Sequence, residues 1–334
     1  MADFKVNHIR SKDGKSGTSF VGVTTVSSTG SMRIPVGPTE NRGGRGRGIN
    51  AGGTATPTST NLIEYVEIAT TGNATDFGDL RVARTQPNTA SGATRGLVMG
   101  GTTIPNIQTA IDYITISSGG GGNDFGDLTV ARRAMSNGSS NSTRAVAYGG
   151  YGTPVQSNII DYVTIATTGD ATDFGDISGS RSYANHGVSS TTRGIIIGGA
   201  GLARKIEYIN FATRGNTLTF GETSTSRNDG GGLSDTTRGV SVGGSSPVNN
   251  LIEYITMATF GNTTDFGDLT QGRGCRGASN PTRGIMMGGN DGSKTNVIDY
   301  ITIQSTGNAA DFGDLIAIVQ QNGVLSDSHG GLGD

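Results

Sequence analysis

The sequence predicts an all-β fold: a six-bladed β-propeller that the C-terminal strand closes into a ring, preceded by an extended or β-hairpin N-terminal arm. Three observations predict it. A unit of 46–49 residues occurs six times, each unit contains four short strands, and the strand missing from the first unit follows the last. The composition agrees, since 57 of the 334 residues are glycine and only 33% are hydrophobic. A helical bundle would need long runs of Ala, Leu, Glu and Lys, and no apolar run approaches the length of a membrane span.

Four landmarks recur in a fixed order along the units, with departures in the third copy, where Ala145 replaces a glycine, and in the fourth and sixth copies. An RGxxxGG element comes first, an apolar strand with a central tyrosine follows, a DFGD element comes about 12 residues later, and an arginine lies eight residues beyond it. The tyrosines are Tyr65, Tyr113, Tyr162, Tyr208, Tyr254 and Tyr300. The phenylalanines of the DFGD element, which reads TFGE in the fourth copy, are Phe77, Phe125, Phe174, Phe220, Phe266 and Phe312. Self-similarity at this period indicates a repeat architecture and excludes a disordered glycine-rich chain.

Two sets of arginines repeat with the units. The first set begins the RGxxxGG element and comprises Arg47, Arg95, Arg144, Arg193, Arg238 and Arg283. The second set follows the DFGD element and comprises Arg84, Arg132, Arg181, Arg227 and Arg273, whereas the sixth copy has Val319. Both sets lie beside repeated aspartates, so we expect rings of charge-assisted Arg–Asp pairs that link adjacent strands or blades.

The unit at 132–181 illustrates the four strands. Gly-, Asn- and Ser-rich turns separate four segments: a small polar segment (134–141), TRAVAYGG (143–150), IIDYVTIA (159–166) and a segment around Phe174. This pattern indicates a small antiparallel sheet. The tyrosine strand is apolar at odd and even positions alike, so we expect its sheet to be covered on both faces, as in radially packed blades.

The two ends of the repeat predict how the ring closes. The first unit begins at its second strand, RGINAGG (47–53), and the segment IAIVQQNGVLSDSHGG after the last DFGD aligns with the first strands of the other units. An open solenoid would instead need polar capping units. Only small side chains fit where six strands converge on the axis, and the central positions there are Asn88, Ser136, Asn185, Gly231, Gly277 and Gly323.

The glycine pair, the tyrosine strand, the later aromatic residue and the arginine resemble the kelch repeat, whose family includes the central domain of galactose oxidase. The resemblance covers about residues 46–331. It departs from the family at the aromatic position, where all six copies have phenylalanine in place of the usual tryptophan. The resemblance implies a kelch-like propeller and does not specify a function.

Residues 1–45 lie outside the repeat, which divides the chain into an N-terminal arm (1–45) and the propeller (46–334). The segment TSFVGVTTVSSTGSMRIPVG alternates around a Ser-Thr-Gly turn and predicts a β-hairpin or extended strands. Residues 1–50 hold eight basic and three acidic side chains, a charge of +5, and the remainder holds 17 and 24, a charge of −7. A basic arm on an acidic ring suggests attachment to another surface; the alternative is a solvated tail.

The arm also resembles known proteins. Within GSMRIPVGPTENRGGRGRG, the residues from Met32 to Gly37 are similar to an R(I/L)PVGTT-like core found in tail-fibre and other virion proteins of tailed phages, including marine cyanophages. The resemblance implies a virion protein, present in several copies per particle, that binds other tail or capsid proteins through its arm. The candidate partner-binding residues are Arg33, Ile34, Pro35, Val36 and Arg42. A host-surface receptor or glycan is a further candidate partner.

Motifs for catalysis or metal binding are not found. DFG occurs in five copies without the HRD and VAIK segments that a kinase needs. The acids Asp170, Asp173 and Asp176 lack the D-x-[DN]-x-[DN]-G order of a calcium loop. We expect them, like Asn73 in the first copy, to cap turns, with calcium binding as the alternative.

Copper chemistry of the galactose oxidase kind needs a tyrosine linked to a cysteine, together with histidine ligands. The three histidines, His8, His186 and His329, stand in unrelated contexts, and the single cysteine, Cys275, is expected to be a buried free thiol on an innermost strand. GGRGRG (43–48) resembles an RGG nucleic-acid segment, but its second arginine begins a repeated strand. We therefore expect no enzyme activity, no catalytic residue, cofactor or metal, and neither nucleic-acid binding nor membrane insertion.

Three functions are compatible with these patterns. The first is a non-enzymatic phage virion structural protein, whose arm anchors the propeller for tail or capsid assembly, decoration or host attachment. The second is a carbohydrate-binding, lectin-type propeller, and the third is a galactose-oxidase-like enzyme. The N-terminal residues show no signal-peptide pattern and there is no tryptophan for sugar stacking, which favours the first. Tyr151 and Tyr183 are the aromatic residues that merit a test for surface binding.

Overall fold

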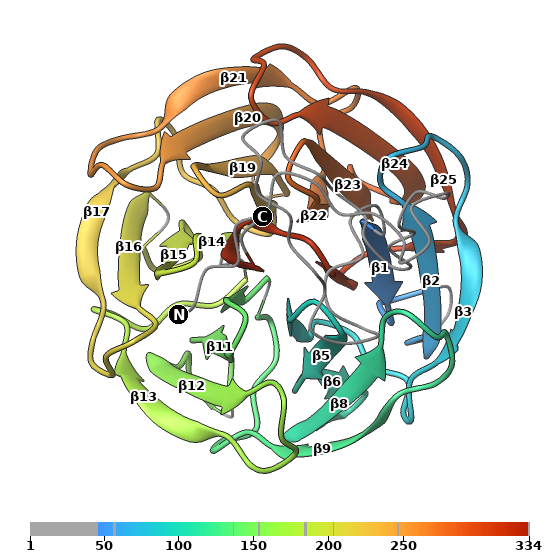
Figure 1. Cartoon of the computed structure of the whole chain (residues 1–334), viewed down its shortest axis with the longest axis vertical. Helices are drawn as coiled ribbons and strands as arrows, with labels where there is room; N and C mark the ends of the chain where they lie inside the picture. The colour runs from blue at the N-terminus through green and yellow to red at the C-terminus, as the bar shows by residue number, and fades with distance from the viewer. Residues whose placement is uncertain are drawn as a thin grey trace, which may run out of the picture. The chain divides into compact units, whose positions relative to one another are not determined.

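The computed structural model describes residues 46–55, 58–135, 137–152, 154–183, 186–202, 204–245 and 247–332. These residues form six antiparallel four-stranded sheets arranged as blades around a central axis (Figure 1). The predicted six-bladed propeller is therefore confirmed. The five candidate residues of the arm, Arg33, Ile34, Pro35, Val36 and Arg42, lie outside the described residues, as do His8, Ser136 and Asn185.

Each blade runs from an innermost strand near the axis to an outermost strand at the rim. Blade 1 consists of β26 (Gly323–Ser326), β1 (Arg47–Ala51), β2 (Leu62–Glu67) and β3 (Thr75–Asp79). Blade 2 consists of β4 (Asn88–Ser91), β5 (Arg95–Met99), β8 (Ala110–Thr115) and β9 (Asn123–Asp127), and a small hairpin, β6 (Thr102–Thr103) and β7 (Asn106–Ile107), joins β5 to β8. Blade 3 consists of β10 (Ser139–Ser140), β11 (Arg144–Tyr148), β12 (Ile159–Thr164) and β13 (Thr172–Asp176).

The other three blades repeat this order. Blade 4 consists of β14 (His186–Ser189), β15 (Arg193–Ile197), β16 (Lys205–Asn210) and β17 (Leu218–Glu222). Blade 5 consists of β18 (Gly231–Ser234), β19 (Arg238–Ser245), β20 (Val248–Thr256) and β21 (Thr264–Asp268). Blade 6 consists of β22 (Gly274–Ser279), β23 (Arg283–Asn290), β24 (Lys294–Thr302) and β25 (Ala310–Val319), and a short 3₁₀ helix, η1 (Gly330–Leu332), follows β26. No helix among the described residues is long and apolar enough to cross a membrane.

The ring closes as the sequence predicts. β26 pairs antiparallel with β1, with Gly48 opposite Ser326 and Ala51 opposite Gly323. The last strand of the repeat therefore supplies the innermost strand of the first blade. Backbone hydrogen bonds between antiparallel strands thus join the two ends of the repeat.

The core lies between the blades. One cluster combines Leu97, Met99 and Phe125 of blade 2 with Ala145 and Ala147 of blade 3. Side chains on both faces of each middle strand are buried in this way, which explains why the tyrosine strands do not alternate between apolar and polar residues. In every blade the tyrosine and the DFGD phenylalanine meet edge to face, with ring centroids 5.7–6.3 Å apart.

The outermost strands are covered by the following blade. Gly215 N–H donates to the carbonyl of Phe174 at 2.8 Å and Thr217 N–H donates to that of Asp176 at 2.9 Å, and the other blades repeat this pattern. Gly175 has φ +147°, and a Cβ there would lie 2.5 Å from the Gly215 backbone. The glycine of DFGD is required because two backbones meet at the rim, and these contacts protect the edge strands.

The axis is crowded, as predicted from its small residues. A Cβ on Gly231 would lie 2.7 Å from the backbone nitrogen of Gly277, and one on Gly277 would lie 2.6 Å from the carbonyl oxygen of Gly232. Asn88 is fully buried.

Candidate functional site

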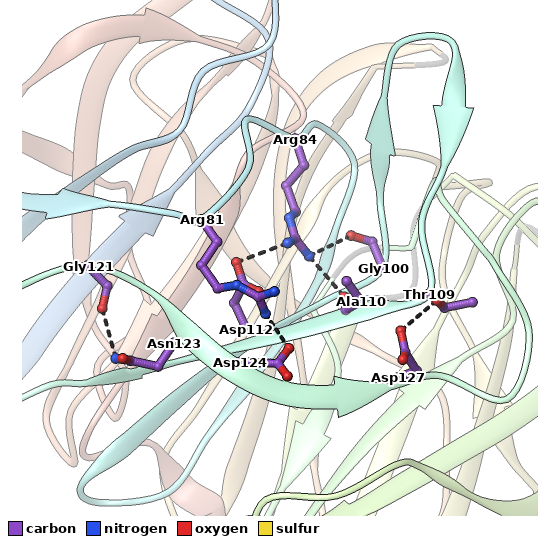
Figure 2. A network of polar contacts seen from close by, with 10 residues as sticks. All are labelled: Arg81, Arg84, Gly100, Thr109, Ala110, Asp112, Gly121, Asn123, Asp124 and Asp127. Atoms are coloured by element: carbon purple, nitrogen blue, oxygen red, sulfur yellow. Dashed lines mark hydrogen bonds and ion pairs between the residues drawn. The ribbon is translucent and has the colours of Figure 1, made fainter.

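The arginines that follow the DFGD element form buried ion pairs. Arg84 Nη2 lies 2.9 Å from Asp112 Oδ2, and Arg84 Nη1 donates to the carbonyl of Ala110 at 2.9 Å (Figure 2). Each pair fixes the linker from one blade onto the middle strand of the next. The equivalent pairs are Arg132–Asp161 at 2.6 Å, Arg227–Glu253 at 2.8 Å, Arg273–Asp299 at 2.8 Å, and Arg181–Glu207.

The expected Arg–Asp pairing is thus confirmed for Arg84, Arg132 and Arg273, whereas Arg181 and Arg227 pair with glutamates. The partner of Arg84 is Asp112, which directly precedes the tyrosine, whereas Asp124 of the DFGD element lies at the exposed rim beside Arg81 (Figure 2). The position of each acid across the blade explains the difference. Asp112 on β8 and Asp124 on β9 lie opposite each other in register, so the acid on the outermost strand lies at the rim, whereas the acid on the inner of these two strands reaches the buried arginine of the linker.

Burial dominates the electrostatics of these pairs. Loss of hydration lowers the pKa of the Arg132 guanidinium, and the nearby Asp161 carboxylate partly offsets this. Burial likewise lowers the pKa of Arg84 and raises the pKa of Asp112, with partial compensation by their mutual attraction. Both partners must therefore be present together, since either charge alone would be buried without compensation.

The arginines of the RGxxxGG elements make different contacts. The prediction of Arg–Asp pairs was wrong for them, and within the described residues only the Arg47 guanidinium has an acidic partner, Glu67 at 3.1 Å. Arg95 stacks on Tyr113 with its guanidinium carbon 4.7 Å from the ring centroid, and its Nη1 donates to the carbonyl of Ile165 in blade 3 at 3.1 Å. All six arginines stack on the tyrosine of their own blade at 4.4–5.2 Å. Stacking on the tyrosine orients each guanidinium, so that its N–H groups can donate to backbone carbonyls of the next blade.

The interface between blades 6 and 1 lacks the arginine. Val319 occupies that position, and the acid Glu64 is fully buried. Glu64 Oε2 accepts a hydrogen bond from Ile316 N–H at 2.6 Å, and Oε1 accepts one from Ala317 N–H at 3.4 Å. Burial raises the pKa of Glu64, which these hydrogen bonds partly oppose. The sixth interface is therefore electrostatically unlike the other five.

A ring of six serines closes one end of the axis. Ser234 Oγ donates to the carbonyl of Ser189 at 3.0 Å, while Ser189 N–H donates to Ser234 Oγ at 3.2 Å. Contacts of this kind join the innermost strands around the ring, through Ser91, Ser140, Ser189, Ser234, Ser279 and Ser326. Each serine is the last residue of its innermost strand, so the sixfold repeat itself places the six hydroxyls at one level.

The segment after β26 lies across this serine ring, at the centre of the propeller (Figure 1). His329 Nε2 lies 2.9 Å from the carbonyl oxygen of Ser91 and 3.0 Å from Ser140 Oγ, and its Nδ1 accepts a hydrogen bond from Gly331 N–H. Burial lowers the pKa of His329. A small cavity of about 40 Å³ remains beneath it, enough for a few waters.

Cys275 is buried, as predicted. Burial raises its pKa to about 11, so the thiol is protonated near neutral pH. Within the described ranges no group of three or more His, Cys, Asp and Glu side chains could hold a metal ion. Asp170 and Asn73 instead accept backbone N–H groups of the preceding blade, from Asp127 at 3.0 Å and from Asp314 at 3.1 Å.

The repeats differ most in the loops between the glycine pair and the tyrosine strand, which share one face of the propeller with the inter-blade linkers. We call this face the loop face. Loops 54–61, 102–109 and 151–158 have eight residues, whereas 200–204 has five. The first residue of each loop lies beside the residue that follows the second-set arginine or Val319. These neighbours are Thr102 and Thr85, Tyr151 and Arg133, Ala200 and Ser182, Ser245 and Asn228, Asn290 and Gly274, and Thr54 and Gln320.

A hollow of about 710 Å³ opens on the loop face between blades 2 and 3. Its lining includes Tyr151 but not Tyr183, so the structure separates the two aromatic residues selected from sequence. Tyr151 lies under Arg133, whose guanidinium carbon is 5.2 Å from the ring centroid. Tyr183 has a left-handed backbone with φ 51°, and its N–H donates to the carbonyl of Ala134 at 2.8 Å.

The other residues of the hollow were not identified from sequence. They are Thr102, Ile104, Pro105, Asn106, Ile107, Val130, Ala131 and Arg133. Part of the signal was present, because Ile104, Ile107 and Arg133 depart from the small or polar residues at the matching positions of the neighbouring copies, and variable loops on a rigid scaffold commonly carry function.

No protein-family model matches the sequence, and no curated protein matches it.

Proposed function

We propose that the protein is a non-enzymatic structural protein of a tailed-phage virion. Its N-terminal arm attaches a kelch-like propeller to other tail or capsid proteins, for assembly, decoration or host attachment. The resemblance of the segment from Met32 to Gly37 to phage virion proteins supports this proposal. The charge of +5 on residues 1–50, against −7 on the remainder, supports an arm that attaches to another surface.

One structural observation supports a binding role for the propeller. The contacts between blades repeat around the ring, whereas the loop face differs from copy to copy. A scaffold whose interfaces repeat in five of six places and whose loops vary on one face suits recognition, since binding residues are commonly carried on loops that a rigid fold positions. Fold alone does not specify function, so it is the variation of the loop face that supports a binding role.

The experiment is to remove residues 1–44 and to measure incorporation of the protein into purified particles. Arg33→Glu and Arg42→Glu in the full chain provide a milder perturbation of the same surface. We expect both changes to lower the number of copies per particle while the thermal unfolding of the propeller stays unchanged. Incorporation at the parental level after truncation would overturn the anchoring role.

A carbohydrate-binding, lectin-type propeller is the second candidate. The observation that favours it is the hollow on the loop face, where Tyr151 and Arg133 lie beside exposed apolar side chains. The two candidates are compatible, since a virion protein can bind a glycan of its host.

A further inference from the structure

The hollow between blades 2 and 3 has the dimensions of a small-molecule site. The β6–β7 hairpin forms one wall, and Val130, Arg133 and Tyr151 contribute to the other. Its volume of about 710 Å³ lies within the range typical of ligand pockets, roughly 300–1,000 Å³. It lies on the loop face, outside the ion pairs and the serine ring that hold the propeller together.

Exposed apolar side chains concentrate in the two loops at this place. Ile104 is 68% exposed and Val155 is 66% exposed, the highest values among the large hydrophobic side chains of the described residues. Val130, from the linker, is 44% exposed. Isolated exposed apolar residues are common, but Ile104 and Val130 both line the hollow and form a surface that a ligand with an apolar face would cover.

Arg133 supplies an uncompensated positive charge at the hollow. Its Nη1 donates to Gln86 Oε1 at 3.2 Å and its guanidinium stacks on Tyr151, but no carboxylate of the described residues lies within ion-pair distance. The preceding arginine provides the contrast, because Arg132 pairs with buried Asp161 at 2.6 Å. A guanidinium that an aromatic ring orients and no acid neutralises suits an anionic ligand, a carboxylate above all.

The polar side chains of the β6–β7 hairpin differ in their access to the hollow. Thr102 belongs to the lining, but its Oγ1 is buried and is therefore not available to a ligand. Asn106 in the same hairpin adds an exposed amide that can donate and accept.

We propose that this hollow binds a carboxylated sugar unit, such as a uronic acid of an acidic surface polysaccharide. The carboxylate pairs with Arg133, ring hydroxyls bond to Asn106, and the apolar face of the ring packs on Ile104. A neutral sugar lacks the charge that Arg133 requires, and a simple carboxylic acid lacks the hydroxyls. The inference deepens the host-attachment role proposed above and rests on it for its biological meaning.

The test measures binding of methyl glucuronide to the full-length protein by titration calorimetry, with methyl glucoside and benzoate as comparison ligands. We expect saturable binding of the glucuronide and at least about tenfold weaker binding of the other two. Arg133→Met should weaken glucuronide binding about tenfold or more, and Asn106→Ala should weaken it severalfold. Arg214→Met, which removes an exposed arginine elsewhere, is the matched control and should bind as the parent does.

Each contrary result overturns the proposal. If the glucuronide does not bind at millimolar concentration, the hollow is not a site for it. If methyl glucoside binds equally well, the charge of the ligand does not matter. If benzoate binds as tightly as the glucuronide, the ligand is not a sugar. If Arg133→Met binds the glucuronide as the parent does, with its unfolding temperature unaltered, Arg133 does not bind the carboxylate. The binding assay uses the isolated protein, so its failure leaves the incorporation experiment intact, and failure of incorporation leaves this site intact.

Discussion

Replacing Asp161 by asparagine should destabilise the propeller by about 3–5 kcal/mol, the usual effect of removing one partner from a buried ion pair. Arg132 and Asp161 are 0% and 1% exposed and lie 2.6 Å apart. The Asp161 carboxylate also accepts hydrogen bonds from Thr129 Oγ1 at 2.7 Å and from Thr129 N–H at 3.2 Å. The amide keeps the volume but leaves the Arg132 guanidinium buried without a counter-charge.

The chain contains a matched control for this change. Glu64 occupies the same position in blade 1, where Val319 replaces the arginine and backbone N–H groups are the partners. Since burial already raises the pKa of Glu64, a neutral amide suits the site, at the cost of about one hydrogen bond. Glu64→Gln should therefore change stability by no more than about 1 kcal/mol.

The assay is urea unfolding at pH 7, followed by far-UV circular dichroism and tyrosine fluorescence. Urea adds no salt and so does not screen the charges under test, and midpoints are compared because a ring of this size need not unfold in two states. We expect a large fall in midpoint for Asp161→Asn and a small change for Glu64→Gln. Equal losses at the two sites would refute the claim that an arginine makes five interfaces different from the sixth.

Three further outcomes are expected. Gly175→Ala should destabilise the ring by about 1–3 kcal/mol more than Gly215→Ala in urea unfolding. The two glycines have nearly the same φ, +147° and +148°, but only a Cβ on Gly175 would meet neighbouring backbone, at 2.5 Å. Equal destabilisation by the two substitutions would contradict the rim contact. His329 has a lowered folded pKa, so the unfolded chain binds the proton more tightly and stability should fall as pH drops below about 6.5. In a His329→Gln variant, the unfolding temperature should no longer fall over this pH range. If it still falls, another titratable group causes the pH dependence. Cys275 should react with a thiol reagent only after denaturation, and fast reaction of the native protein would show that the axis is open.

Much of the fold could be predicted because the repeat constrains it. Six copies of a unit too small to bury its own faces must pack on one another, and a first strand found only after the last unit must complete the first blade. The glycines of the rim and axis follow from the same geometry, since backbones meet there. These inferences need only the order and spacing of the landmarks.

The partners of the arginines could not be predicted from spacing. Asp112 and Asp124 are both acids near Arg84 in the repeat. They lie opposite each other on β8 and β9, and only the acid on the inner of these two strands reaches Arg84. Arg95 likewise stacks on Tyr113, a residue 18 positions away on the adjacent strand. Strand register determines both contacts, and register is a property of the folded sheet.

The hollow could be predicted even less. Its wall combines the loop around Ile104 with the linker at Val130 and Arg133, segments of two different blades. Tyr151 was selected as an exposed aromatic residue, but its pairing with Arg133 depends on a bridge between linker and loop. The position of His329 on the serine ring similarly depends on how the segment after β26 crosses the axis.

Electron cryomicroscopy of the native particle tests the central proposal most directly. The proposal predicts six-bladed density on the tail or capsid, with residues 1–45 in contact with another virion protein. Particles that lack this propeller, or that hold it with the first 45 residues free of any neighbour, would contradict it.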